Sequence, residues 1–508
     1  MDIDNNFLNE ASKIFNKDTK NKLARDAVTA TKLDNIIINR ELLQKHNRIF
    51  SNTIKTKTSP SNQKRSGRCW LFAICNLIRI KMIEEYKLPA EFEVSQSYLF
   101  FYNILEKSNH FLHLITKFKD EETTSRMNYY LLSLPISDGG NWNMIVNLIN
   151  KYGVVPKTSF NESFNTENTY YLNYFLSNKL RDYAFVIRNM ENKEIPKFIE
   201  KCMKEVYRIL VIFMGEPPSK ISWEYLSNNK YKLIQDITPQ EFYKNHVPFK
   251  INDYILLADN PLQKPYTNFT IDYFNNMKDG EIINYVNVPK EDIKKAIKLS
   301  LDSHDPLWFG CDVDKYLDKT NGILDLDMIN YRNVFNTDIT LNKKFRLEYM
   351  TSDVTHAMLL RGYDNQTIAK KICKEIIEKV PKSKSIRNKK LTIKSKKSIT
   401  KSKKKTKKIN KSKSKSKKQF GGSKKTQKKK VCPRTRYTSN NAITKYLVEN
   451  SWGKNDNDEN IVMTNEYFEE YCYIVAVHKK YLPNKIIKIL KQKPIHLNLW
   501  DPFGDLLF

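Results

Sequence analysis

The feature that most constrains the fold is Cys69, which stands directly before a long apolar run that ends near Tyr86. Apolar residues at Leu71, Ile74 and Leu77 recur at helical spacing, so the run predicts a mostly buried helix with Cys69 in its first turn. The N-terminus of a helix carries partial positive charge and lowers the pKa of a thiol placed there. Taken alone, such a cysteine is more often a core residue than a nucleophile.

Three further residues supply the partners that a nucleophilic thiol needs. Gln63, six positions upstream, can donate its side-chain amide to an oxyanion together with the backbone N–H of Cys69. His356 precedes an apolar strand pattern and can provide an imidazolium beside the thiolate. Asn450 follows the strand pattern 445–449 and can accept a hydrogen bond from the other imidazole nitrogen. The joint pattern outweighs the structural interpretation of each residue and predicts a cysteine hydrolase.

Two tryptophans and a glycine pair accompany these candidates. Trp70 follows the nucleophile directly, and Trp452 would shield the bond between the histidine and the asparagine from water; we expect both to support the site. The run Asp138-Gly139-Gly140 has two interpretations. It is a tight turn, or it is an edge at which absent side chains let a substrate backbone dock.

The net charge of +31 lies mostly in one segment. Residues 382–430 contain 24 lysines or arginines and neither aspartate nor glutamate, which leaves +7 for the rest of the chain. With so few apolar residues the segment cannot offset the entropy of ordering, so we predict disorder. The segment is either a solvated low-complexity insert or a site that binds nucleic acid or another polyanion through phosphates. Nuclear targeting and attachment to an anionic assembly are two further interpretations of the same charge. Aromatic residues are not interleaved through it, which argues against base stacking.

Other functional classes find little support in the composition. The seven cysteines are widely spaced and neither they nor the histidines show zinc-ligand spacing, so we expect no metal, no cofactor and a reducing compartment. The first residues do not resemble a secretory signal, and no apolar run approaches the ~20 residues of a membrane span. We therefore expect a cytoplasmic protein without a membrane partner.

Composition and patterning divide the 508 residues into four segments. Residues 1–60 form a polar N-terminal arm, and 61–365 form the main part of the core, with an inserted middle block at about 160–300. Residues 366–443 are the Lys/Ser-rich insertion, and 444–508 complete the core.

Three runs of the core read as buried strands and would hold the histidine and the asparagine on a sheet that faces the cysteine helix. They are residues 307–313, 358–363 and 445–449. The fold class expected from this arrangement is α+β.

Further motifs follow one another through most of the chain in the order of one known family. They are residues 62–63, 66–73, 92–101, 138–140, 151–157, 223–225, 237–243, 308–313, 355–358, 448–453 and 500–504. On these motifs the chain resembles bleomycin hydrolase and aminopeptidase C, a branch of the papain-like cysteine peptidases. The resemblance implies a papain-like fold with a helical half that carries the nucleophile and a sheet half that carries the histidine.

The resemblance also implies an activity and an assembly. Cys69 and His356 are 287 positions apart, about twice the interval of a plain papain-like enzyme. In the family the additional middle block supplies helical and hook-like parts of a homohexamer whose active sites face an inner channel. The implied activity is removal of N-terminal residues from peptides, with bleomycin-hydrolase-like amide hydrolysis. The C-terminal tail of the family lies in the active-site cleft, so Leu506, Leu507 and Phe508 are expected to limit attack to the first residues of a substrate.

Overall fold

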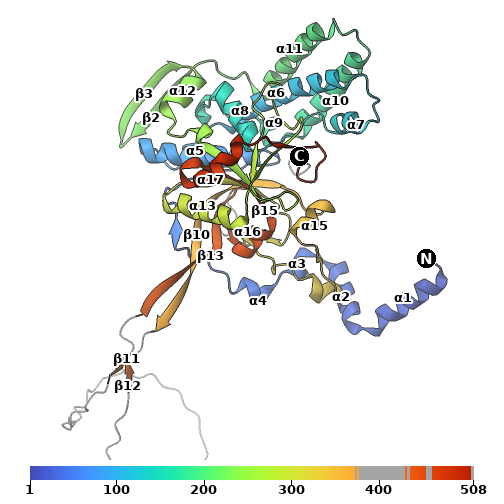
Figure 1. Ribbon diagram of the computed structural model, residues 1–508, viewed down its shortest axis with the longest axis vertical. Coiled ribbons are helices and arrows are strands. Elements are labelled where there is room, and N and C mark those ends of the chain that lie inside the picture. Colours follow the sequence, from blue (N-terminus) through green and yellow to red (C-terminus); the bar gives the residue numbers. More distant parts are fainter. Residues whose placement is uncertain (372–373, 377–428, 432–434, 454–459, 505–508) are drawn as a thin grey trace, which may run out of the picture. The chain divides into compact units, whose positions relative to one another are not determined.

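The computed structural model of the chain describes residues 1–371, 374–376, 429–431, 435–453 and 460–504 (Figure 1). The chain forms two compact units. The first comprises Met1–Gln366 together with Asn441–Phe508, and the second comprises Thr367–Asn440. In the second unit, strand β11 (Lys374–Ile376) pairs antiparallel with β12 (Lys429–Val431). The segment 382–430, predicted to be disordered, lies outside the described residues except for 429 and 430, which belong to β12.

The helical half of the first unit is built around the cysteine helix α5 (Cys69–Tyr86). This helix is apolar on nearly all sides and buried, and it ends where Lys87 adopts a left-handed conformation (φ 55°). It packs against α6 (Gln96–Lys117), whose N-cap is Ser95. Helix α5 agrees with the helix predicted from the apolar spacing.

More helices cover α6 and α5. Helices α8 (Trp142–Tyr152), α10 (Tyr170–Arg188) and α11 (Ile195–Met214) pack against α6, and Figure 1 shows α6, α10 and α11 side by side. The other helices of this unit from residue 126 onward are α7 (Arg126–Ser133), α9 (Phe164–Glu167), α12 (Pro239–His246), α13 (Lys290–Asp302), α14 (Tyr331–Phe335), α15 (Lys343–Glu348), α16 (Asn465–Tyr471) and α17 (Asn484–Ile487).

The other half of the unit is a twelve-stranded sheet. In spatial order its strands are β16 (Ile495–Leu497), β5 (Thr267–Ile271), β6 (Tyr285–Asn287), β4 (Tyr254–Ala258), β15 (Cys472–His478), β7 (Leu307–Cys311), β10 (His356–Lys371), β13 (Thr435–Glu449), β14 (Asn460–Thr464), β9 (Ile323–Leu324) and β8 (Leu317–Asp318), and β1 (Asn52–Thr53) pairs with β10. The central strands β7 and β15 are buried along nearly their whole length, which explains their continuous apolar sequences. The predicted strands at 307–313, 358–363 and 445–449 correspond to β7, β10 and β13, so the fold is α+β as expected.

The range 160–300, in which the inserted middle block was expected, also contributes strands to the main sheet. Strands β4, β5 and β6 fall inside the range 160–300 but belong to the main sheet, where β4 pairs with β15 and β5 pairs with β16. The partner strands β15 and β16 come from the C-terminal part of the chain, and a local pattern cannot reveal such pairing. The hairpin of β2 (Ile221–Ser227) and β3 (Lys230–Ile237) does stand apart as a separate two-stranded sheet.

Short helices occupy the predicted N-terminal arm. They are α1 (Asn5–Lys17), α2 (Thr19–Ala30), α3 (Asp34–Ile37) and α4 (Arg40–Leu43). Within the described ranges, no helix combines the length and apolarity that a bilayer crossing requires.

Candidate active site

Cys69 and His356 are each the first residue of their element, α5 and β10. The two side chains are buried and hydrogen-bonded to each other. The backbone N–H of Ala357 also donates to Cys69 Sγ, with N and S 3.5 Å apart. The helix start and the strand start therefore meet at one point, as the sequence pattern predicted.

The pKa values of these two groups shift in opposite directions. Burial alone would raise the pKa of Cys69, but the charge of His356, its hydrogen bond and two backbone N–H groups bring that pKa below its usual value. Burial alone would lower the pKa of His356, but the charge of the Cys69 thiolate and the hydrogen bonds that the ring donates to Cys69 and Asn450 raise it. Because each group stabilises the charged form of the other, the arrangement favours a thiolate–imidazolium pair.

The other cysteines that the structure describes behave differently. Burial raises the pKa of Cys75, Cys311 and Cys472, and it raises the pKa of Cys202 to about 11. These thiols remain protonated and unreactive near neutral pH. Cys69 is thus distinguished from them by its environment.

Asn450 fixes the orientation of the imidazole. Its Oδ1 lies 2.7 Å from Nε2 of His356 and accepts a hydrogen bond from it, which leaves Nδ1 as the nitrogen available to Cys69. The ring of Trp452 lies 5.0 Å from the imidazole, centroid to centroid, in a tilted arrangement. Trp452 thus packs beside the imidazole, and the shielding role expected for it stays a prediction.

Gln63 is held beside the nucleophile by Ser451, which follows Asn450 just after β13. Its backbone N–H donates to the carbonyl of Ser451 over 2.8 Å, and its side-chain Oε1 accepts from Ser451 Oγ over 2.6 Å. One hydrogen of Gln63 Nε2 is taken by the carbonyl of Ser66, at 2.6 Å, so the second remains for an oxyanion. Ser451 was missed in the sequence; its position next to Asn450 was the only available signal.

A cavity of about 210 Å³ opens at these groups. Gln63, Cys69 and His356 line it, as does the run Asp138-Gly139-Gly140. The structure thus brings these predicted residues together at one opening. Phe508, also predicted to contact substrate, lies outside the described residues.

The run Asp138-Gly139-Gly140 is fixed tightly against Trp70. The indole Nε1 of Trp70 donates to the carbonyl of Asp138 over 2.7 Å. A Cβ added at Gly140 would lie 2.7 Å from the Trp70 ring, so only glycine fits there without displacing the indole. Trp70 therefore supports this edge of the cavity.

The carboxylate of Asp138 already has partners within the chain. It accepts from the backbone N–H of Gly67 over 3.0 Å, and from the side chains of Thr169 and Asn173 near the start of α10. Asp138 thus anchors the run. In contrast, within the described residues the backbone N–H and C=O of Gly140 have no hydrogen-bond partner and remain available at the cavity.

No group of three or more histidine, cysteine, aspartate or glutamate side chains in the described ranges is placed to hold a metal ion.

Comparison with known proteins identifies the family. The Peptidase C1-like family matches residues 2–381 and 389–504. Human bleomycin hydrolase is 31% identical over 507 residues, covering 97% of this chain and 96% of the human protein. Aminopeptidase C of Listeria innocua is 33% identical over 464 residues, covering 90% and 88%. The crystal structure of PepW from Lactobacillus rhamnosis HN001 superimposes with a TM-score of 0.82 at 28% identity, covering 100% of this chain and 99% of PepW. The chain therefore belongs to the Peptidase C1-like family, in the branch of bleomycin hydrolase and aminopeptidase C, and is a cysteine peptidase with a papain-like fold.

Proposed function

We propose that the chain is an aminopeptidase that removes the first residues of peptides by attack of the Cys69 thiolate. The observation that carries this proposal is the buried Cys69–His356 pair, whose opposite pKa shifts favour the charged form of both groups at the wall of an open cavity. The name of the Listeria relative, aminopeptidase C, supports the N-terminal specificity.

The proposed reaction follows from the positions of the four polar side chains of the site, which are Cys69, His356, Asn450 and Gln63. The Cys69 thiolate attacks the scissile carbonyl, and the resulting oxyanion takes hydrogen bonds from the free Nε2 hydrogen of Gln63 and from the Cys69 backbone N–H. His356 then gives its proton to the leaving amine, which departs and leaves a thioester. A water molecule gives one proton to His356 as its oxygen attacks the thioester carbonyl. The C–S bond then breaks, the product leaves as a carboxylic acid, and the Cys69 thiolate and the His356 imidazolium are restored as a pair.

The substrate backbone is proposed to dock along Gly139 and Gly140. The unpaired N–H and C=O of Gly140 at the cavity can exchange hydrogen bonds with an extended peptide, in the manner of an added strand. Because only backbone is presented there, this contact selects an unfolded chain and not a particular side chain.

The restriction to N-terminal residues is proposed to come from the tail up to Phe508. The ring of Phe503 packs 5.6 Å from Tyr285, whose hydroxyl accepts from Asn141 Nδ2 over 2.7 Å. Asn141 directly follows Gly140 at the cavity edge. These contacts link Phe503 to the residue that follows the cavity edge, which supports the proposed role of the tail.

The homohexamer and bleomycin-hydrolase-like amide hydrolysis are proposed from the family resemblance. The five described cysteines are all free thiols, which agrees with the proposed reducing, cytoplasmic location. The mass in solution, measured by light scattering, tests the assembly directly: a monomer would contradict the hexamer and leave the chemistry of Cys69 unaffected.

One experiment tests the activity. Purified protein under reducing conditions is expected to hydrolyse an aminoacyl reporter amide with a free N-terminus and to leave its N-acetylated counterpart intact. Cys69→Ala should abolish turnover, whereas the matched control Cys75→Ala, on the same helix, should retain it. A wild-type protein that hydrolyses neither reporter would contradict the proposal, and equal hydrolysis of both would contradict the N-terminal specificity.

A second candidate function rests on the segment 382–430. Its 24 basic residues without an acidic one favour binding of nucleic acid or another polyanion through backbone phosphates. In that case the peptidase fold would be secondary to binding.

A further inference from the structure

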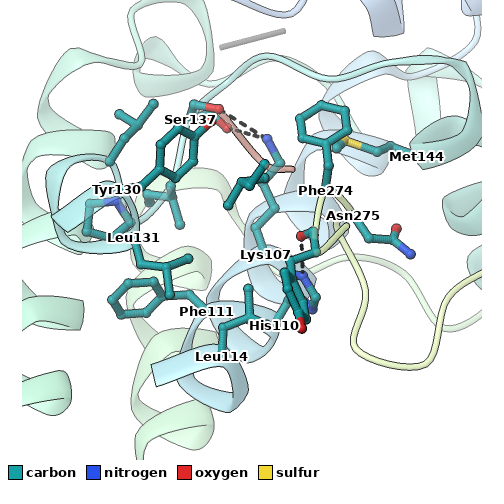
Figure 2. A pocket seen from close by; sticks show the side chains of 15 residues that line it. Lys107, His110, Phe111, Leu114, Tyr130, Leu131, Ser137, Met144, Phe274 and Asn275 are labelled. Carbon is teal, nitrogen blue, oxygen red and sulfur yellow. Dashed lines mark hydrogen bonds between the residues drawn. The ribbon is translucent and has the colours of Figure 1, made fainter. Parts of the chain in front are cut away.

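A lysine reaches the substrate-docking edge from outside the catalytic cavity. Lys107 lies on α6, and its Nζ donates to the carbonyl of Gly139 over 2.6 Å, to the carbonyl of Ser137 over 3.0 Å and to Ser137 Oγ over 3.2 Å. Figure 2 shows the ammonium group directed at Ser137. All three hydrogens of the ammonium are thus used on the short segment 137–139.

This segment stands between two cavities. Ser137 lines both the catalytic cavity and a second one of about 70 Å³, which Lys107 also lines (Figure 2). The walls of the second cavity are mainly apolar, with Phe111, Leu131 and Met144 among them. A cation in such surroundings is costly unless it is hydrogen-bonded, so the three acceptors on the segment hold the ammonium in place.

Several titratable groups of the described residues lie around Lys107. Asp138, on the segment itself, is the nearby negative charge. His110, one turn along α6, is kept neutral because burial lowers its pKa. Tyr130 and Tyr273 line the same cavity with their phenol rings. Burial lowers the pKa of Lys107 itself to about 8, against the opposing effect of Asp138.

We propose that Lys107 is a positioning residue that fixes the docking edge, so that the free N–H and C=O of Gly140 face the bound peptide. The proposal rests on the proposed function, because it assumes that peptides dock on this edge. The hydrogen bonds of Lys107 go to Ser137 and Gly139 and not to Cys69, His356 or Gln63, so its role is in binding and not in the chemical step. A neutral amine donates two hydrogen bonds and accepts one, so loss of the proton leaves one of the three acceptors unpaired and loosens the edge.

The test measures peptide affinity in the absence of chemistry. A short peptide with a free N-terminus is titrated into the full chain carrying Cys69→Ala, with and without Lys107→Met or Lys107→Arg. At pH 7, Lys107→Met should weaken binding about tenfold, the loss of roughly one charge-assisted hydrogen bond. Lys107→Arg should bind nearly as well as the parent, because arginine stays charged and donates to the same carbonyls.

The pH dependence separates positioning from mere structural support. The α-amino group of the peptide titrates near pH 8 whichever protein variant binds it. The informative quantity is therefore the difference in pH-dependent affinity between the variants. From pH 7 to 9.5 the parent should lose several-fold more affinity than Lys107→Arg, since only lysine gives up its proton in that range. Lys117→Met, on the same helix but bonded to the Tyr273 hydroxyl, serves as the control and should follow the parent.

The outcomes are distinct. Identical pH profiles for the parent and Lys107→Arg, or unchanged affinity in Lys107→Met, would overturn the inference. If Lys107→Met does not fold, the comparison between the parent and Lys107→Arg decides alone. A protein that binds no peptide at pH 7 and hydrolyses no reporter would instead contradict the proposed function.

Discussion

Glu449, one residue before Asn450, forms a buried ion pair with Arg79 of the cysteine helix, with Oε1 and Nη2 2.9 Å apart. Its other carboxylate oxygen accepts from Arg361 of β10 over 2.7 Å. The Glu449 and Arg79 side chains are 0% and 1% exposed. A single carboxylate therefore connects the three elements that carry the catalytic cysteine, histidine and asparagine.

Removal of this carboxylate should be strongly destabilising. In Glu449→Gln two buried guanidinium groups lose their counter-charge, and breaking such a cluster typically costs about 3–5 kcal/mol. Urea unfolding of wild type and variant checks the value. The exposed pair of Lys204 and Glu200 on α11 provides the control, because Glu200→Gln should leave the free energy of unfolding nearly unchanged. Similar losses in both variants would contradict the connecting role of Glu449.

Gln63→Ala should lower kcat by about 10²–10³-fold, since one oxyanion donor is lost. Binding of the ground-state peptide should change little, because the oxyanion exists only after attack. Steady-state kinetics on the aminoacyl reporter measures both effects. Ser451→Ala is the companion variant: it removes the hydroxyl that holds Gln63 Oε1 and should give a smaller loss in the same direction. A change in KM alone would show that Gln63 acts in binding.

The parts of the site that could be predicted are those with a local signature. Cys69 opens an apolar helix and His356 opens an apolar strand, so type and place of each element follow from neighbouring residues. Other contributors form hydrogen bonds to residues that lie 30 to 388 positions away in the chain, and these contributors are Glu449, Ser451 and Lys107. Their partners depend on packing and pairing that a single sequence does not encode locally, as is also true of strands β4 to β6 in the main sheet.

The pH dependence of activity and of Cys69 alkylation should show that His356 lowers the pKa of the Cys69 thiol. Cys69 is a thiolate only above its lowered pKa, and His356 can protonate the leaving amine only below its raised pKa, so kcat/KM should fall on both sides of the interval between them. The rate of Cys69 alkylation by iodoacetamide follows the thiolate directly. In His356→Ala the stabilising charge and hydrogen bond are gone while burial remains, so the alkylation profile should move to higher pH. An unmoved profile would show that another group lowers the thiol pKa.

The basic insertion can be removed between the paired strands β11 and β12, which precede and follow most of it. Ile376 of β11 pairs with Lys429 of β12, so replacing residues 377–428 by a two-residue Asn-Gly turn keeps this pairing closed. Every catalytic candidate lies in the other compact unit, so we expect kcat/KM on the aminoacyl reporter to stay within about twofold of wild type. Binding to duplex DNA, measured at several salt concentrations, should be lost, whereas wild type should bind with an affinity that falls steeply as salt increases. DNA binding that survives the replacement would place the polyanion site elsewhere, and a large fall in kcat/KM would show that the insertion takes part in substrate capture.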